Sequence, residues 1–292
     1  MIEKTPLEDW IRKRIGLKSD ILNRERLETY QFNAWLENIA YVKNNGSFYK
    51  NLLSHVEPDD IQSLKDIQKI PFTTSEDVKK HNTRMVCVSQ KEINRIVTLD
   101  TSGTTDLPKR IYFTVEDQAL TTDFFHIGMS TFTNPGEKVL VLLPGVRPGS
   151  IGDLLQTALK RMNVEAMVYG VVDDGEKVEQ IILNEEINGI VGIPQQVFAL
   201  SKLTNSKKIK DQGQLKHILL STDYVSHAVV KKIKENWGCE VYDHYGMTEM
   251  GLGGGVCSCS GRCGWVGFEP DADASGYHRS PFGRFWLGLV LL

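Results

Sequence analysis

The stretch KVLVLLPGVRPGSIGDLLQTALKRMNVEAMVYG, residues 138–170, decides the fold class of this chain. It opens with a short apolar run, continues with apolar residues at helical spacing, and returns to an apolar run that ends at a glycine. Apolar runs of this length are typical of buried strands, and the segment between them is long enough for a helix. The stretch therefore predicts a strand, a helix and a second strand.

The same alternation continues to residue 246. Further strand candidates are GIVGIP, LKHILLST and CEVYDHYG, and further helix candidates are GEKVEQIILNEEI, PQQVFALSKLT and SHAVVKKIKENWG. The polar segment TNSKKIKDQGQ is interpreted as a connection. The predicted strands are too apolar to face water, and they alternate with predicted helices. This pattern predicts an α/β fold with a largely parallel sheet covered by helices. Ligands of such sheets lie outside the carboxyl ends of the strands.

The first ninety residues predict a mostly helical lead-in. Residues 20–43 place apolar side chains at helical spacing and are followed by NNG, a glycine signal for a helix end. The pairs Thr74 and Asp77, and Thr114 and Asp117, have the spacing of capping boxes. We expect a lead-in over residues 1–92, an α/β core over 93–255, and an atypical tail over 256–292. The tail has no helix or sheet period and resembles a frameshifted or disordered end.

Composition excludes several classes of protein. The chain has 292 residues, 41% of them apolar, and 34 basic against 37 acidic side chains give a net charge of −3. This balance predicts neither a nucleic-acid partner nor an anionic membrane surface. The charged N-terminus is unlike a signal peptide, no apolar run is long enough to span a bilayer, and five cysteines form no disulfide framework. We expect a reduced, soluble, cytoplasmic protein; its oligomeric state is not indicated.

The first candidate site is TLDTSGTTDLPKRIYFT, residues 98–114, which lies between two strand candidates, INRIVTL and RIYFTV. This loop contains hydroxyl groups, a glycine that permits close approach of the backbone, and one ammonium group. These are the groups that bind a polyphosphate. The Walker pattern is absent, because Pro108 precedes the lysine and Arg110 follows it. The alternative is an ordinary solvated hairpin. The candidate phosphate-binding residues are Thr101, Ser102, Gly103, Thr104, Thr105 and Lys109.

The second candidate site is YDHYGMTEMG, residues 242–251, directly after the last predicted strand. The ring of Tyr245 can stack on a nucleotide base, and the Asp243 carboxylate can accept a hydrogen bond from an amine of that base. The Thr248 hydroxyl can donate to a phosphate oxygen, and Glu249 can bind Mg²⁺. The alternative is a loop with a packed tyrosine and a solvated glutamate. A third candidate, residues 221–224 (STDY), has short polar groups at a strand end; its alternative is a helix cap by Ser226 or Asp223.

Taken together, these segments resemble the adenylate-forming superfamily of acyl-CoA synthetases, and within it the phenylacetate–CoA ligase-like branch. TSGTTDLPK is similar to the phosphate loop of that superfamily and YGMTE to its adenylate motif. YQFNAWLENIAYVKNNGSFYKNLL and IQSLKDIQKIPFTTSEDVKK are similar to the lead-in of the phenylacetate branch. The resemblance extends from about Tyr30 to Gly255 and implies the large N-terminal domain of such an enzyme.

The resemblance implies activation of a carboxylic acid by Mg·ATP and transfer of the acyl group to coenzyme A. The residues implied in catalysis are Lys109, Thr248 and Glu249, with Glu249 as the magnesium ligand. Those implied in nucleotide binding are Thr101, Ser102, Gly103, Thr104, Thr105, Lys109, Ser221, Thr222, Asp223, Asp243, Tyr245, Gly246 and Thr248. A non-catalytic nucleotide-binding remnant and an acyl-protein synthetase are the alternatives.

The sequence departs from the family pattern in three ways. Asp106 stands where a glycine is usual, which bears on ATP affinity because a carboxylate repels phosphate. The small C-terminal domain of the family, with its lysine, is not found, so we expect a truncated chain of uncertain activity. Cys257, Cys259 and Cys263 are candidate Zn²⁺ ligands, but their spacing lacks a C-x-x-C pair and favours free thiols.

Overall fold

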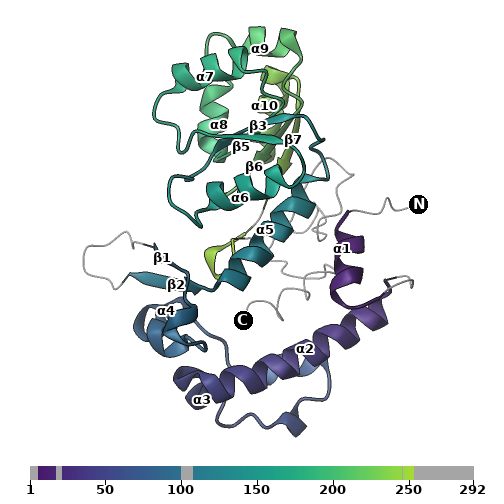
Figure 1. Cartoon of the computed structure of the whole chain (residues 1–292), viewed down its shortest axis with the longest axis vertical. Helices are drawn as coiled ribbons and strands as arrows, with labels where there is room; N and C mark the ends of the chain where they lie inside the picture. The colour runs from purple at the N-terminus through teal and green to yellow at the C-terminus, as the bar shows by residue number, and fades with distance from the viewer. Residues whose placement is uncertain (1–5, 18–21, 100–107, 245, 253–292) are drawn as a thin grey trace. The chain divides into compact units, whose positions relative to one another are not determined.

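The computed structural model describes residues 6–17, 22–99, 108–244 and 246–252 (Figure 1). The chain divides into two compact units. The first unit is chiefly Gln118–Met247, and the second is chiefly Ile11–Asp117 together with Thr248–Gly251. The predicted boundaries after residues 92 and 255 stay predictions.

The described part of the chain contains helices, short 3-10 turns and strands. The helices are α1 (Pro6–Arg14), α2 (Arg24–Asn45), α3 (Ser47–Leu52), α4 (Ser75–His81), α5 (Val115–Met129), α6 (Ile151–Lys160), α7 (Gly175–Asn184), α8 (Pro194–Leu200), α9 (Ser206–Gln212) and α10 (His227–Trp237). The 3-10 turns are η1 (Pro58–Asp60), η2 (Leu64–Lys69), η3 (Asn82–Met85), η4 (Gln90–Glu92) and η5 (Thr248–Met250). The strands are β1 (Arg95–Leu99), β2 (Lys109–Phe113), β3 (Lys138–Leu142), β4 (Glu165–Val168), β5 (Gly189–Gly192), β6 (His217–Leu220) and β7 (Glu240–Asp243). No described helix combines the length and apolarity needed to cross a membrane.

The first unit is built on a five-stranded sheet with the order β4-β3-β5-β6-β7. All four strand pairs are parallel. Successive side chains of a strand point to opposite faces of its sheet. In β3 both Leu140 and Leu142 on one face and Val139 and Val141 on the other are fully buried. The predicted α/β fold with a parallel sheet covered by helices is therefore confirmed.

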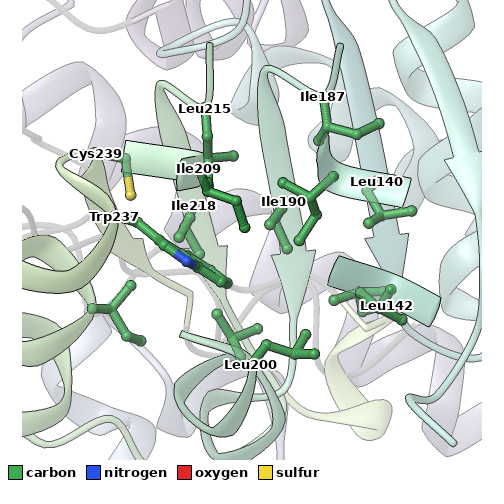
Figure 2. Close-up of a cluster of buried hydrophobic side chains, with 14 of the residues drawn as sticks. Leu140, Leu142, Ile187, Ile190, Leu200, Ile209, Leu215, Ile218, Trp237 and Cys239 are labelled. Atoms are coloured by element: carbon green, nitrogen blue, oxygen red, sulfur yellow. The ribbon is translucent and has the colours of Figure 1, made fainter. Parts of the chain in front are cut away.

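One face of this sheet packs against helices α7 to α10. Figure 2 shows Leu140, Ile190 and Ile218, from three neighbouring strands, in one cluster with Leu200 of α8 and Trp237 of α10. A core of this kind fixes the strands rigidly with respect to one another. The loops at their carboxyl ends consequently start from well-defined positions.

The second unit contains a helical cluster and a hairpin. Trp35, Ile39 and Val42 of α2 pack with Leu53 and Val56, which follow α3. In the hairpin β1 pairs antiparallel with β2, where the sequence predicted two strands joined by a loop, and Leu99 lies opposite Lys109. The last residue of β1 and the first residue of β2 are thus held opposite each other.

Both predicted capping boxes are present. The Thr74 hydroxyl accepts a hydrogen bond from the Asp77 amide at 3.1 Å, and the Asp77 carboxylate accepts one from the Thr74 amide at 2.8 Å. The corresponding distances for Thr114 and Asp117 are 3.1 and 2.7 Å. These reciprocal bonds satisfy amides that a helix start leaves unpaired, which is why α4 and α5 begin there.

Two details differ from the sequence-based expectation. The segment interpreted as a polar connection contains the helix α9, whose Ile209 is fully buried. Gly46 ends α2 as expected, but its φ of −106° is extended and not left-handed. A Cβ at this position would lie 2.8 Å from both the Cys87 sulfur and the Tyr49 ring, so close packing is the reason for the glycine.

Candidate functional site

Lys109 and Glu249 form an ion pair in the second unit, although they are 140 positions apart in the sequence. Lys109 is the first residue of β2, and Glu249 is the middle residue of η5. Their side chains are only 19% and 27% exposed, so each charge is partly removed from water and needs the other. The structure therefore brings together the lysine predicted to bind phosphate and the glutamate predicted to bind magnesium.

Of the other residues predicted to bind phosphate, Thr248 is among those that the structure describes and the rest are not. Thr248 begins η5, next to Glu249, and is partly buried. Thr101 to Thr105 and Asp106 lie outside the described residues, as does Tyr245. Their predicted roles stay predictions.

A second group of predicted residues lies at the carboxyl edge of the sheet in the first unit. Ser221 follows β6 directly, and Asp243 is the last residue of the neighbouring β7 (Figure 1). The amide of His244 donates to Leu220 O at 2.8 Å, and the Ser221 hydroxyl lies 2.9 Å from His244 Nδ1. Two of the predicted segments, STDY and the start of YDHYGMTE, are thus joined by hydrogen bonds.

The loop after β6 has an unusual backbone. Thr222 has a φ of 75°, in the left-handed region that a β-branched residue rarely adopts. Asp223 accepts a hydrogen bond from the amide of its neighbour Tyr224 at 2.7 Å. Ser226, and not Asp223, caps α10, because its hydroxyl accepts from the Val229 amide. The helix-cap alternative therefore accounts for Ser226 but leaves Ser221 to Asp223 unexplained.

His244 is a residue of this edge that sequence reasoning missed. Its side chain contacts Ser221 and the rings of Phe124 and Phe125 in α5. Burial lowers the pKa of His244 to about 4, so the imidazole is neutral at pH 7. The signal was its place inside the quoted motif, between Asp243 and Tyr245.

Exposed apolar side chains of the first unit gather at the same edge. Four large ones are exposed among its described residues, and each follows the carboxyl end of a strand within four positions. They are Val146 after β3, Val171 after β4, Tyr224 after β6 and Met247 after β7. All four therefore lie on loops that follow the carboxyl ends of the strands.

The opposite, amino edge carries a buried polar cluster around Glu137. Its carboxylate accepts hydrogen bonds from Lys216 Nζ at 2.8 Å and the Asn134 amide at 3.0 Å, and it lies 3.0 Å from His217 Nε2. Burial by itself would raise the pKa of Glu137, but these bonds together hold it at about 2. Burial lowers the pKa of His217. This cluster lies at the opposite ends of the strands from Ser221 and Asp243.

The candidate zinc ligands Cys257, Cys259 and Cys263 lie outside the described residues. Within the described part of the chain no three histidine, cysteine, aspartate or glutamate side chains gather in a way that could hold a metal ion. Glu249 is therefore the carboxylate that pairs with Lys109, and among the described residues it belongs to no cluster that would cage a cation.

The parallel sheet, with polar motif loops at its carboxyl edge, defines the class of the protein as a ligand-binding α/β protein. The family model of the AMP-binding enzymes matches residues 50–277. The chain belongs to the AMP-binding enzyme family.

Known proteins similar to this chain agree with the family. The phenylacetate-coenzyme A ligase of Thermus thermophilus is 25% identical over 252 residues, which is 81% of this chain and 53% of that protein. An open structure of 2-hydroxyisobutyryl-CoA ligase with 2-HIB-AMP and CoA superposes with a TM-score of 0.66 at 18% identity, over 81% of this chain and 55% of that one. A thioesterification-state structure of the same ligase gives a TM-score of 0.67 at 19% identity, over 79% and 53%. The chain spans about half the length of these relatives.

Proposed function

We propose that this chain is the nucleotide-binding part of an AMP-forming acid–CoA ligase. The observation that carries the proposal is the ion pair between Lys109 and Glu249. One residue ends the hydroxyl-rich loop and the other belongs to the YGMTE motif, and the fold brings them together from 140 positions apart. A phosphate-binding lysine and a magnesium-binding glutamate have to be neighbours, because the metal and the lysine meet the same phosphates.

The proposed reaction has two steps. An oxygen of the acid attacks the α-phosphorus of ATP, the bond to the β-phosphate breaks, and pyrophosphate leaves. The thiol of coenzyme A then attacks the acyl carbon, and AMP leaves. In this scheme the chain supplies no nucleophile; it positions the reactants and balances charge.

The ion pair is compatible with these roles. Lys109 and Glu249 neutralise each other in a partly buried place, so neither charge is left unpaired. Lys109 would donate to the β- and γ-phosphates of ATP, which Thr101, Ser102, Gly103, Thr104 and Thr105 would also contact. Thr248 would donate to the α-phosphate.

The donor set at Glu249 fits magnesium. Mg²⁺ prefers one or two carboxylates together with phosphate oxygens and water, and Glu249 is a partly buried carboxylate beside the proposed phosphate-binding lysine. Glu249 would hold the ion, which when bound neutralises phosphate charge.

The adenosine half is assigned to the carboxyl edge of the sheet. Tyr245 would stack on adenine next to Gly246, and Asp243 would accept from its amine. The edge of the adenine ring would be lined by Ser221, Thr222 and Asp223. The hydrogen bond between Ser221 and His244, the positive φ of Thr222 and the exposed Tyr224 support this assignment.

Two measurements on the chain test the proposed function. We expect ATP with Mg²⁺ to bind in isothermal titration calorimetry, whereas GTP binds at least tenfold more weakly because the proposed pocket reads adenine. Pyrophosphate exchange that depends on an added acid would establish adenylation; ATP binding without exchange would identify a non-catalytic nucleotide-binding chain. Absence of ATP binding would refute the proposal. Competition between coenzyme A and carrier proteins distinguishes a CoA ligase from an acyl-protein synthetase.

A further inference from the structure

The imidazole of His244 has one satisfied and one unsatisfied nitrogen. Nδ1 lies 2.9 Å from the Ser221 hydroxyl. Nε2 is buried and has no hydrogen-bond partner among the residues that the structure describes. The rings of Phe124 and Phe125 lie close by, each with its centroid 6.4 Å from that of the imidazole.

The hydrogen-bond pattern favours one position of the imidazole proton. Within the described part of the chain, the Ser221 hydroxyl has His244 Nδ1 as its side-chain partner. If Ser221 donates to Nδ1, one buried group, Nε2–H, is left without a described partner; if Nδ1–H donates to Ser221, both the hydroxyl proton and the Nε2 lone pair are left without one. We therefore assign the proton of the neutral ring to Nε2, which makes this nitrogen a neutral N–H donor.

A buried N–H without an acceptor is costly, and native proteins rarely leave one unpaired. His244 follows β7 directly, at the carboxyl edge where ligands of parallel sheets lie. The residue as a whole is only partly buried, although Nε2 itself is buried. An acceptor atom on a ligand is thus the natural partner for Nε2.

The apolar surroundings of His244 Nε2 determine which part of the bound substrate can lie next to it. A triphosphate or a free carboxylate loses its hydration at high cost beside two phenylalanine rings and a neutral donor. An apolar acyl group that carries one neutral oxygen loses little hydration free energy there, and it gains a hydrogen bond to Nε2. We propose that His244 Nε2 donates a hydrogen bond to a hydroxyl or carbonyl oxygen carried by the acyl group of the acid substrate. The acids that this site selects are therefore carboxylic acids with a second, oxygen-containing substituent. This inference rests on the proposed function and names the substrate class of its acid site.

The test uses non-hydrolysable acyl-adenylate analogues, the acyl sulfamoyl adenosines, in matched pairs. The pairs are phenylacetyl against its α-, 2-, 3- and 4-hydroxy forms, and isobutyryl against 2-hydroxyisobutyryl. Calorimetry gives the affinity ratio within each pair. We expect at least one hydroxylated analogue to bind the unaltered chain about tenfold more tightly than its parent, because one buried donor gains its acceptor.

Three variants separate recognition from structure. In His244→Gln the amide nitrogen reaches the place of Nε2, so the preference should persist. In His244→Asn it reaches only the place of Nδ1, and in His244→Phe no donor remains; both should lose the preference while still binding the parent analogue. Circular dichroism melting establishes that each variant is folded.

Each remaining outcome has a definite meaning. Equal affinities within every pair, or a preference that survives in His244→Phe, would overturn the inference while leaving the proposed function intact. A preference kept by His244→Asn but lost by His244→Gln would show that the ring acts only through Ser221, which also overturns it. If neither ATP nor any adenylate analogue binds, the proposed function itself fails and the inference fails with it.

Discussion

At the scale of single residues, Thr222 is the clearest sign that the loop after β6 serves a purpose other than connection. A positive φ at a β-branched residue costs roughly 1–2 kcal/mol, and Thr222 is exposed, so side-chain packing does not offset that cost. Strain of this kind is retained where a backbone conformation is needed. The conformation directs Ser221 and Asp223 at the carboxyl edge.

Replacing Thr222 with glycine removes the steric conflict. We expect Thr222→Gly to raise the free energy of unfolding by about 0.5–1 kcal/mol, since relief of strain exceeds the added freedom of the unfolded chain. Thr222→Ala, which keeps a Cβ, is the matched control and should change stability less. Urea denaturation measures both. A loss of stability in the glycine variant would show that the backbone is unstrained there.

At the scale of elements, the cluster around Glu137 ties the start of β3 to the start of β6. The lowered pKa of Glu137, about 2 against an ordinary value of 4.5, means that the folded state favours the charged carboxylate. Its contribution is complete above pH 4.5 and is lost as the pH falls toward 2. His217, whose pKa is lowered by burial, adds to acid sensitivity below its ordinary value of 6.5.

The variant Glu137→Gln tests this cluster. We expect it to lower the free energy of unfolding at pH 7 by about 2 kcal/mol, because charge-assisted hydrogen bonds to a buried carboxylate are lost. Its stability should also vary less than that of the unaltered chain between pH 4.5 and 2. Glu165→Gln is the control, since Glu165 is 66% exposed and lies 3.5 Å from Lys138. An unchanged acid slope in Glu137→Gln would contradict the account.

The elements that sequence predicted best are those with strong local signals. The apolar runs of β3 and β5 and the capping boxes at Thr74 and Thr114 act within a few residues, so spacing alone identifies them. Helix α9 was missed because SKKIKDQ is polar and its single buried residue, Ile209, shows no period. Gly46 was assigned the right place for the wrong reason, since the approach of Cys87 comes from a distant segment.

At the scale of the whole molecule, the candidate site depends on contacts that no local pattern encodes. Motif resemblance selected Lys109 and Glu249 separately, but their pairing depends on a hairpin and a turn 140 positions apart. The bond between Ser221 and His244 likewise depends on the order of β6 and β7 in the sheet. Sequence thus predicted the family and named candidate residues whose roles stay predictions, whereas the partners of the described ones required the fold.

The central claim is that Lys109 binds phosphate and Glu249 binds the magnesium that accompanies it. Calorimetric titration of ATP with and without Mg²⁺ tests both roles at once. We predict that Lys109→Ala weakens ATP binding at least tenfold in both conditions, because a charge-assisted hydrogen bond is lost. Glu249→Gln should lose only the gain in affinity that Mg²⁺ provides.

The matched controls for this titration are Lys80→Ala and Glu76→Gln, an exposed ion pair at 3.1 Å on α4 in the same unit. Both should bind ATP like the unaltered chain, with the same response to Mg²⁺. Lys109→Ala and Glu249→Gln variants that bind ATP as the controls do would contradict the account. A tenfold loss in Lys109→Ala, together with loss of the Mg²⁺ effect in Glu249→Gln, is the result it predicts.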